Sequence, residues 1–160
     1  MKYVLAFIFF NVSVVLNAQE NVTVKKETTT SLCKKECSIN NSPETSLIEQ
    51  TLQDYIKGSS YNELELLESA FYNEATLYLT VRDEFKKMSP KEYCLLFNGS
   101  AKGTFNGRYG KIQSIDIVKD IATATVEISI PARKWTFIDL FLLKKTTQGW
   151  KIISKTATKI

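Results

Sequence analysis

The sequence of 160 residues contains no histidine, only three cysteines and six glycines, and its charges nearly balance. Without histidine, mechanisms that need an imidazole base and mixed cysteine–histidine zinc sites are excluded. The net charge is +4, and no run of like charge exceeds two residues. A basic stripe of the kind that follows phosphates is therefore missing, and we expect no nucleic-acid partner. We expect no cofactor either.

The cysteines are few, and their spacing does not favour a metal. Cys33 and Cys37 bracket a short polar stretch and are candidates for a local disulfide in an oxidising compartment, which leaves Cys94 as a buried small apolar residue. A Cys-x3-Cys pair without a second ligand pair cannot complete a tetrahedral zinc shell, so no metal site is expected. A lipid anchor on Cys33 is not expected either, because this cysteine lies seventeen residues past Leu16.

Long apolar runs are also scarce, and the one at the N-terminus is too short to span a membrane. Lys2, an apolar stretch from Tyr3 to Leu16 and the small residue Ala18 are typical of a secretory signal peptide over residues 1–18. Cleavage there leaves 160 − 18 = 142 residues, and we expect an exported protein, periplasmic or secreted, with no membrane span in the mature chain. Residues 19–43 are polar and read as a disordered tether, and the folded domain is expected over residues 44–160.

Three helices are predicted after the tether. Ser46 and Glu49 form a capping box, and apolar residues recur at helical spacing until Gly58, namely Leu47, Ile48, Leu52, Tyr55 and Ile56. Ser60 and Glu63 repeat the box for a second helix that ends near Asn73. In "SPKEYCLLF" Ser89 caps a third helix, with Pro90 in its first turn and Glu92 closing the box.

Strands dominate the remainder. A β-leaning run covers residues 75–81, a glycine-rich loop covers residues 98–110, and four further segments form a meander, at 111–118, 121–130, 135–144 and 150–158. Two to three N-terminal helices followed by a meander predict an α+β domain, with the helices packed on a strongly curved antiparallel sheet that forms a cone. A small-molecule pocket is expected at the open end of this cone.

The order of these elements, together with "IEQTLQDYIKG", "ESAFYNEATLY", "MSPKEY", "IQSIDIVKDIATATVEI" and "FIDLFLLKKTTQGWKIISK", resembles the nuclear-transport-factor-2-like superfamily. Within it, the chain is most similar to the branch labelled putative lumazine-binding, a relative of SnoaL-like and ketosteroid-isomerase-like proteins. The resemblance implies a cone-shaped barrel with an internal pocket and a homodimer formed through the outer face of the sheet. Where members often carry a histidine after the aromatic of "AFYNEA", this chain has Tyr72, so the resemblance does not extend to a histidine-dependent dehydratase.

The last hairpin places one acid among apolar residues. A loop symmetric about residues 146 and 147 pairs Asp139 with Ser154 and assigns Lys155 to the opposite face. The face shared with Asp139 then carries Trp135, Phe137, Phe141, Leu143, Trp150, Ile152 and Ser154.

Two interpretations of Asp139 follow. In the first, apolar surroundings raise its pKa and it serves as a catalytic acid or base, with a phenol from Tyr55, Tyr72 or Tyr78. In the second, it accepts hydrogen bonds or pairs with Arg108 or Lys155 and fixes the curvature of the sheet. Burial of an unpaired carboxylate is costly enough that some partner is required in either case.

The functional hypotheses depend on the same region. The preferred one is a protein that binds a small apolar or heterocyclic molecule without catalysis, and the alternatives are an isomerase- or cyclase-type enzyme using Asp139 and a non-enzymatic interaction module. Aromatic side chains suit a flat heterocycle. The ligand-pocket candidates are Tyr55, Phe71, Tyr72, Tyr78, Phe97, Trp135, Phe137, Phe141, Trp150 and Ser154.

Overall fold

The computed structural model describes residues 42–160, which form an α+β domain. Its helices are α1 (Pro43–Ser60), α2 (Leu64–Ser69) and α3 (Pro90–Cys94), with 3-10 turns at Leu95–Phe97 and Pro131–Arg133. Its strands are β1 (Phe71–Val81), β2 (Glu84–Met88), β3 (Tyr109–Val118), β4 (Ile121–Ile130), β5 (Trp135–Thr146) and β6 (Gly149–Lys159). The predicted signal peptide, most of the predicted tether, and the disulfide candidates Cys33 and Cys37 lie outside the described residues.

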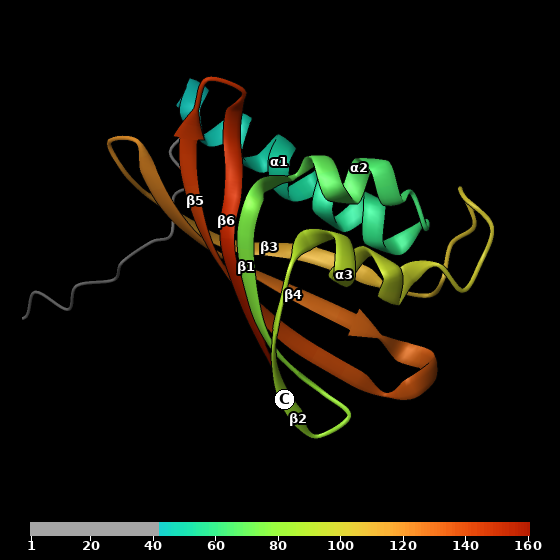
Figure 1. The fold of residues 1–160 in the computed structure, drawn as a ribbon. Helices are drawn as coiled ribbons and strands as arrows, with labels where there is room; N and C mark the ends of the chain where they lie inside the picture. Colours follow the sequence, from blue (N-terminus) through green and yellow to red (C-terminus); the bar gives the residue numbers. More distant parts are fainter. Residues whose placement is uncertain (1–41) are drawn as a thin grey trace, which may run out of the picture. The chain divides into compact units, whose positions relative to one another are not determined.

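The six strands form one curved sheet in the order β2-β1-β6-β5-β4-β3, with the helices on one side of it (Figure 1). The last four strands form the predicted antiparallel meander, and β2 pairs antiparallel with β1. The pairing of β1 with β6 is parallel, so the sheet is mixed. The fold class predicted from the sequence is confirmed, with this one parallel pairing added.

Helix α1 is longer at both ends than its sequence pattern predicts. It begins at Pro43, because Ser42 is the N-cap and its side chain accepts a hydrogen bond from the backbone N–H of Thr45 at 3.2 Å. Gly58 does not end the helix, which continues to Ser60. The glycine instead permits close contact, since a Cβ at Gly58 would lie 2.5 Å from the backbone nitrogen of Leu67 in α2.

Helix α2 is shorter than predicted. The prediction that it ends near Asn73 is wrong, because it ends at Ser69. The chain leaves α2 at Ser69, and Phe71 already pairs with Ile152 in the sheet, next to a hydrogen bond from the Ile152 N–H to the Ala70 carbonyl at 3.0 Å. The parallel pairing with β6 therefore outweighs the helical spacing of the apolar residues at this point. The capping box of Ser89 and Glu92 at α3 is confirmed.

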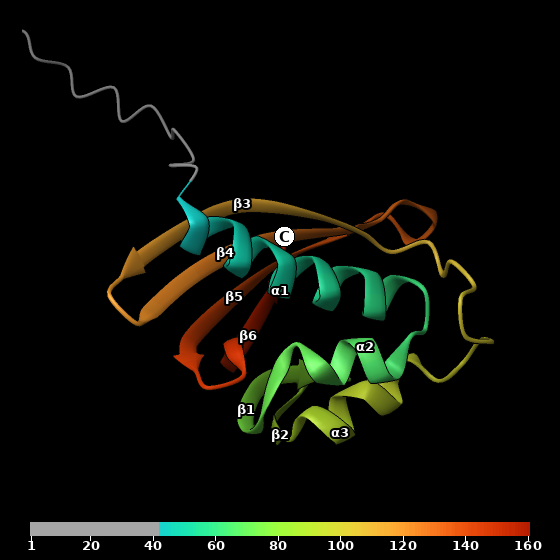
Figure 2. The same cartoon turned by 90° about the horizontal axis from the view of Figure 1, so that it is seen from above.

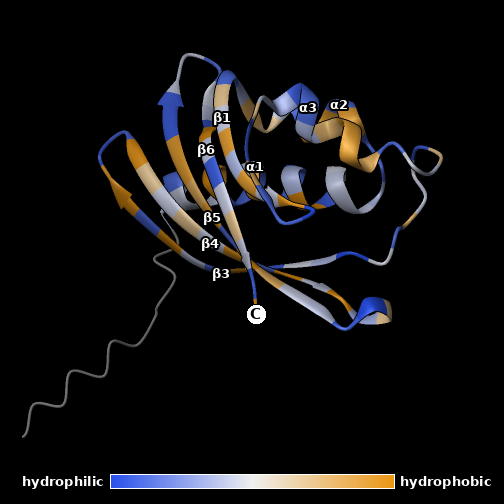
Figure 3. Cartoon of the chain, turned by 60° about the horizontal axis from the view of Figure 1, so that its bottom comes forward, coloured by the Kyte–Doolittle hydropathy of each residue, from blue (hydrophilic) through white to orange (hydrophobic). Residues whose placement is uncertain are grey.

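The core lies between the helices and the concave face of the sheet. Helix α1 contacts β3 and β6, while α2 and α3 contact β1 (Figure 2). Hydrophobic residues concentrate on α2 and in bands along the strands, as expected for alternation between two faces (Figure 3). The buried stripe of α1 consists of Ile48, Leu52, Tyr55 and Ile56. This stripe brings the phenol of Tyr55 over the middle of the sheet.

The contact between α1 and α2 generates the first prediction. Gly58→Ala should destabilise the domain by about 2 kcal/mol or more in urea unfolding, because the new methyl group meets backbone atoms that cannot rotate away. The higher helix propensity of alanine offsets only about 1 kcal/mol of this loss. Gly99→Ala is the matched control, since a Cβ there meets nothing within 4 Å. Equal stability of the two variants would contradict this account of the helix contact.

Candidate functional site

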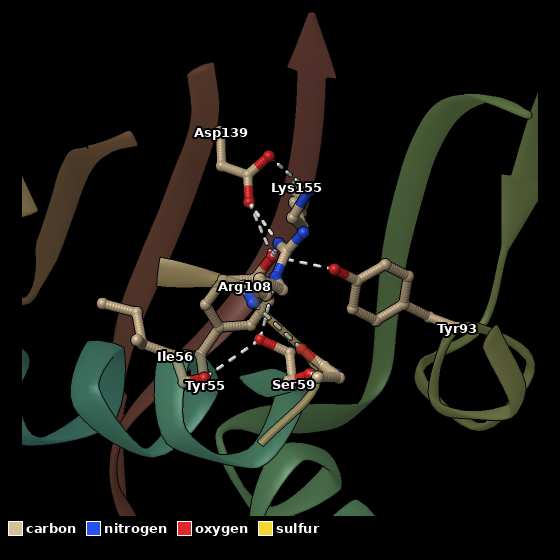
Figure 4. Close-up of polar contacts among 8 residues, drawn as sticks. Tyr55, Ile56, Ser59, Tyr93, Arg108, Asp139 and Lys155 are labelled. Atoms are coloured by element: carbon tan, nitrogen blue, oxygen red, sulfur yellow. Dashed lines mark hydrogen bonds and ion pairs between the residues drawn. The ribbon is translucent and has the colours of Figure 1, made fainter. Parts of the chain in front are cut away.

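Asp139 lies on the concave face of β5, where its side chain is 2% exposed. Its Oδ2 atom accepts a hydrogen bond from the Tyr55 hydroxyl at 2.6 Å and lies 3.4 Å from Nη2 of Arg108. Its Oδ1 atom lies 3.0 Å from Nζ of Lys155. Side chains from two strands, α1, α3 and a loop thus converge on one buried polar cluster (Figure 4). Of the two interpretations of Asp139, this geometry matches the ion-paired one.

Lys155 reaches this cluster because of a bulge in β6. Thr146 pairs with Gly149, so the hairpin loop is Thr147–Gln148. This pairing differs from the predicted register by two residues. A shift of two residues keeps the same face of the strand inward. Beyond it, Leu143 pairs with Ile152 but Leu142 pairs with Ser154, so one extra residue sits in β6 and the next side chains change faces.

The predicted pairing of Asp139 with Ser154, and the placement of Lys155 on the outer face, are therefore wrong. Asp139 faces Ala157 across the strands, and Lys155 points inward with only 2% of its surface exposed. Ser154 instead donates a hydrogen bond to the carbonyl of Thr76 at 3.1 Å. Strict alternation fails here because the extra residue reverses the side-chain parity of the strand.

Arg108 comes from the glycine-rich loop between α3 and β3. Asn106 fixes this loop, because its Nδ2 atom donates to the Ser59 carbonyl at 2.7 Å at the end of α1. Gly107 follows with φ +84°, a conformation that suits glycine, and turns the chain inward. The Arg108 guanidinium then donates from Nε to Ser59 Oγ at 3.2 Å and from Nη2 to Tyr55 Oη at 2.9 Å.

Two phenols complete the cluster, Tyr55 from α1 and Tyr93 from α3. Their hydroxyl oxygens are 2.8 Å apart, and both side chains are buried. Burial raises the pKa of Tyr55 well above its usual value, and the Asp139 charge raises it further. Burial also raises the pKa of Tyr93. Both phenols therefore stay neutral near pH 7 and act as hydrogen-bonding groups.

Lys155 is enclosed by aromatic rings. Its Nζ atom lies 5.4 Å from the ring centroid of Tyr93, 5.7 Å from that of Phe141 and 5.8 Å from that of Tyr55. Burial lowers the pKa of this lysine, and repulsion from Arg108 acts in the same direction, whereas attraction to Asp139 opposes the shift. The ammonium thus depends on Asp139 for its main counter-charge.

Four residues of the polar cluster, Tyr93, Arg108, Asp139 and Lys155, line a cavity of about 610 Å³ and form its floor. Apolar and aromatic side chains form most of its wall, and charged residues occupy the floor and the rim. The lining residues are Leu79, Thr80, Val81, Arg82, Asp83, Tyr93, Leu96, Phe97, Arg108, Trp135, Phe137, Asp139, Lys155, Ala157, Thr158 and Lys159.

The residues proposed from the sequence for the ligand pocket divide into two groups. Phe97, Trp135 and Phe137 line the cavity together with Asp139. The others do not line it: Tyr55, Phe71 and Phe141 are core residues, Tyr72 and Tyr78 are each 40% exposed, Trp150 is buried elsewhere, and Ser154 faces β1.

Trp150 does not line the cavity and instead connects the β5–β6 hairpin to α1. Its Nε1 atom donates to a carboxylate oxygen of Glu44 at 2.7 Å, and Lys145 reaches the other oxygen at 2.8 Å. These contacts fasten the first turn of α1 to the β5–β6 hairpin. Tyr78 stacks on Phe85 of β2, with ring centroids 6.2 Å apart.

Sequence reasoning did not propose Tyr93, and it considered Arg108 and Lys155 only as structural partners of Asp139. Tyr93 follows the capping box of α3 directly, and it sits on the side of that short helix that turns toward the sheet. Because α3 was predicted correctly, the spacing from Ser89 was a usable signal for Tyr93. No comparable signal exists for the loop that carries Arg108.

Other kinds of site find no support within residues 42–160. No group of three potential metal ligands occurs there, and no helix in this range is long and apolar enough to cross a membrane. Cys94 is a free thiol in this part of the chain, and burial raises its pKa to about 11. It is therefore inert as a nucleophile near neutral pH.

Comparison with solved structures places this arrangement in the nuclear-transport-factor-2-like fold. A protein of that fold and of unknown function from Methylobacillus flagellatus is 27% identical with a TM-score of 0.65, covering 78% of this chain and 98% of its own. A second one, from Shewanella baltica, is 22% identical with a TM-score of 0.63, covering 73% and 94%. A ketosteroid isomerase-like protein from Erwinia carotovora atroseptica is 16% identical with a TM-score of 0.56, covering 74% and 98%.

Comparison of the sequence with models of protein families identifies the family of this chain. The chain belongs to the family described as "Putative lumazine-binding", whose model matches residues 43–157. No curated protein matches the sequence. The family resemblance predicted from the sequence is thus confirmed, and the matched residues run from the start of α1 into β6.

The buried ion cluster generates the second prediction. Asp139→Asn should lower the free energy of unfolding by about 3–5 kcal/mol, because Arg108 and Lys155 would remain buried without their counter-charge. Asp116→Asn removes a carboxylate from the exposed side of β3 and should change stability by less than about 0.5 kcal/mol. Urea unfolding followed by tryptophan fluorescence measures both. A stable Asp139→Asn protein would favour a purely functional role for the acid.

Proposed function

We propose that this domain binds a small apolar or heterocyclic molecule in its cavity and does not catalyse a reaction on it. The observation that carries the proposal is the cavity itself, because about 610 Å³ falls in the range of known small-molecule sites, roughly 300–1,000 Å³. Its wall is mostly apolar, while its charged groups lie at the floor and at the rim. Sites that orient a ligand by a few polar groups have this division.

The aromatic wall suits a flat ligand. Phe97 and Phe137 line the cavity, and Trp135 lies beside Phe137 with their ring centroids 6.1 Å apart and their planes at 90°. Rings in such positions can contact the face or the edge of a bicyclic heterocycle. The description of the family supports testing lumazine as one such compound.

The state of Asp139 favours binding over proton transfer. One carboxylate oxygen meets Tyr55 and Arg108, and the other meets Lys155. A general base needs an oxygen within hydrogen-bond reach of the proton it removes. Because both oxygens already serve protein donors, the isomerase or cyclase alternative has less support than binding.

Export and dimerisation belong to the same proposal. The N-terminal pattern of the sequence supports cleavage after residue 18 and a periplasmic or secreted location. The outer face of the sheet supports a homodimer, because Leu140 and Leu142 on β5 are 49% and 39% exposed there. Native mass spectrometry of the protein purified from its source tests both, through the mass of the mature chain and the subunit count.

The third prediction tests the cavity as the binding site. Ala157→Phe places a ring in the cavity opposite Asp139 and should weaken binding of lumazine and of the neutral probe N-phenyl-1-naphthylamine at least tenfold in fluorescence titrations. Thr156→Phe is the matched control, because it adds the same ring to the adjacent, exposed position of β6. Binding that survives Ala157→Phe would place the site elsewhere, and no binding of either compound by the wild-type protein would argue against the proposed function.

A further inference from the structure

The floor of the cavity contains more positive than negative charge. Arg108 and the protonated form of Lys155 each contribute one positive charge, and within residues 42–160 Asp139 is the one carboxylate that pairs with them. Tyr55 and Tyr93 stay neutral because burial raises the pKa of both phenols. One net positive charge therefore remains in a region that is largely shielded from water, which is unfavourable unless an anion compensates it.

The same imbalance extends along the whole cavity. Its lining contains four cationic side chains, Arg82, Arg108, Lys155 and Lys159, against two carboxylates, Asp83 and Asp139, which leaves a net charge of 4 − 2 = +2. Arg82 and Asp83 form the turn between β1 and β2, where they largely balance each other. The excess is thus located at the floor and along β6.

Both floor cations have N–H groups that make no hydrogen bond or ion pair with residues 42–160. Arg108 donates through Nε and Nη2, whereas its Nη1 atom makes no hydrogen bond with any residue from 42 to 160. Lys155 has three ammonium hydrogens, and within the same range Asp139 is its one polar partner. Their side chains are 11% and 2% exposed, and both residues line the cavity, so the unused donors are reached from the cavity.

The surroundings of the donors define the rest of the ligand. The Phe97 ring lies 5.5 Å from the Arg108 guanidinium carbon, and Phe97 and Phe137 both line the cavity above the floor. The Nη1 atom of Arg108 and the ammonium group of Lys155 can each donate to one oxygen of a carboxylate, and adjacent rings match an aromatic body. A compound with its anionic group at one end of a flat ring system satisfies both parts.

We propose that the cavity selects an aromatic or heteroaromatic carboxylate, whose anionic group lies between Arg108 and Lys155 and whose ring packs against Phe97 and Phe137. This inference rests on the proposed function and narrows it from a small apolar molecule to an organic anion. Asp139 then serves as a positioning residue, which holds the two cations in place for the ligand. The bulge in β6 is the element that creates the site, since it turns Lys155 inward.

A matched pair of compounds tests the charge requirement directly. The full chain without its first eighteen residues is titrated by isothermal calorimetry with 2-naphthoate and with 2-naphthamide, which has a similar shape and no charge. We expect naphthoate to bind at least tenfold more tightly at pH 7. Lys155→Gln should reduce this preference to about twofold or less, whereas Lys91→Gln, which makes the same change in net charge at an exposed residue outside the cavity, should preserve it.

The pH dependence in the wild-type protein provides a test that needs no folded variant. The charged and titratable groups that face Lys155 are Tyr55 from α1, Tyr93 from α3, Arg108 from the loop and Asp139 from β5. The pKa of Lys155 in the folded protein is lowered from 10.5. The preference for naphthoate should be complete at pH values below this lowered pKa, where the ammonium is charged. This preference should decline as the pH rises through the lowered pKa of Lys155, while naphthamide binding stays constant.

The outcomes separate this inference from the proposed function. Equal affinity for naphthoate and naphthamide overturns the anion site and leaves the binding function in place. Failure of both compounds to bind, together with failure of lumazine and the neutral probe, overturns both. A preference for naphthoate that survives Lys155→Gln unchanged also contradicts the assignment, because Lys155 would then contribute nothing to recognition of the carboxylate.

Discussion

Asp139 faces Arg108 through one carboxylate oxygen and Lys155 through the other, in a part of the core from which water is largely excluded. Each of these charges would be unfavourable there alone, so the three side chains fix one another's positions. They also connect separate parts of the chain, since they come from a loop and from two neighbouring strands. The arrangement of α1, the loop and the end of the sheet therefore depends on this cluster.

The cluster in turn determines what the cavity can accept. A wall of apolar and aromatic residues would by itself admit many small apolar molecules. The buried cations change this, because an anion compensates their excess charge and a neutral molecule does not. Stability and selectivity therefore depend on the same three side chains. Asp139 compensates one of the two positive charges and holds Arg108 and Lys155 in place, while the other positive charge is available to an anionic ligand.

The sequence predicted the α+β class, the meander and the start of α3 because each has a local signal, in capping residues or in alternation. It did not predict the inward position of Lys155, because a single extra residue in β6 leaves no mark on composition or hydropathy. Phe71 was assigned to a helix, since its parallel partner Ile152 lies about 80 residues away in the chain. Asp139 was identified because a carboxylate among apolar residues requires a partner, but its partners depend on tertiary structure.

The pKa of Lys155 is the measurement that tests the central claim most directly. NMR of the lysine side chains across an alkaline titration reports it in the ligand-free protein and after 2-naphthoate is added. The account predicts a pKa below 10.5 without ligand, despite the nearby Asp139, and a rise when the anion binds. A pKa at or above 10.5 in the free protein, or no change on addition of naphthoate, would contradict the claim that the floor lacks negative charge.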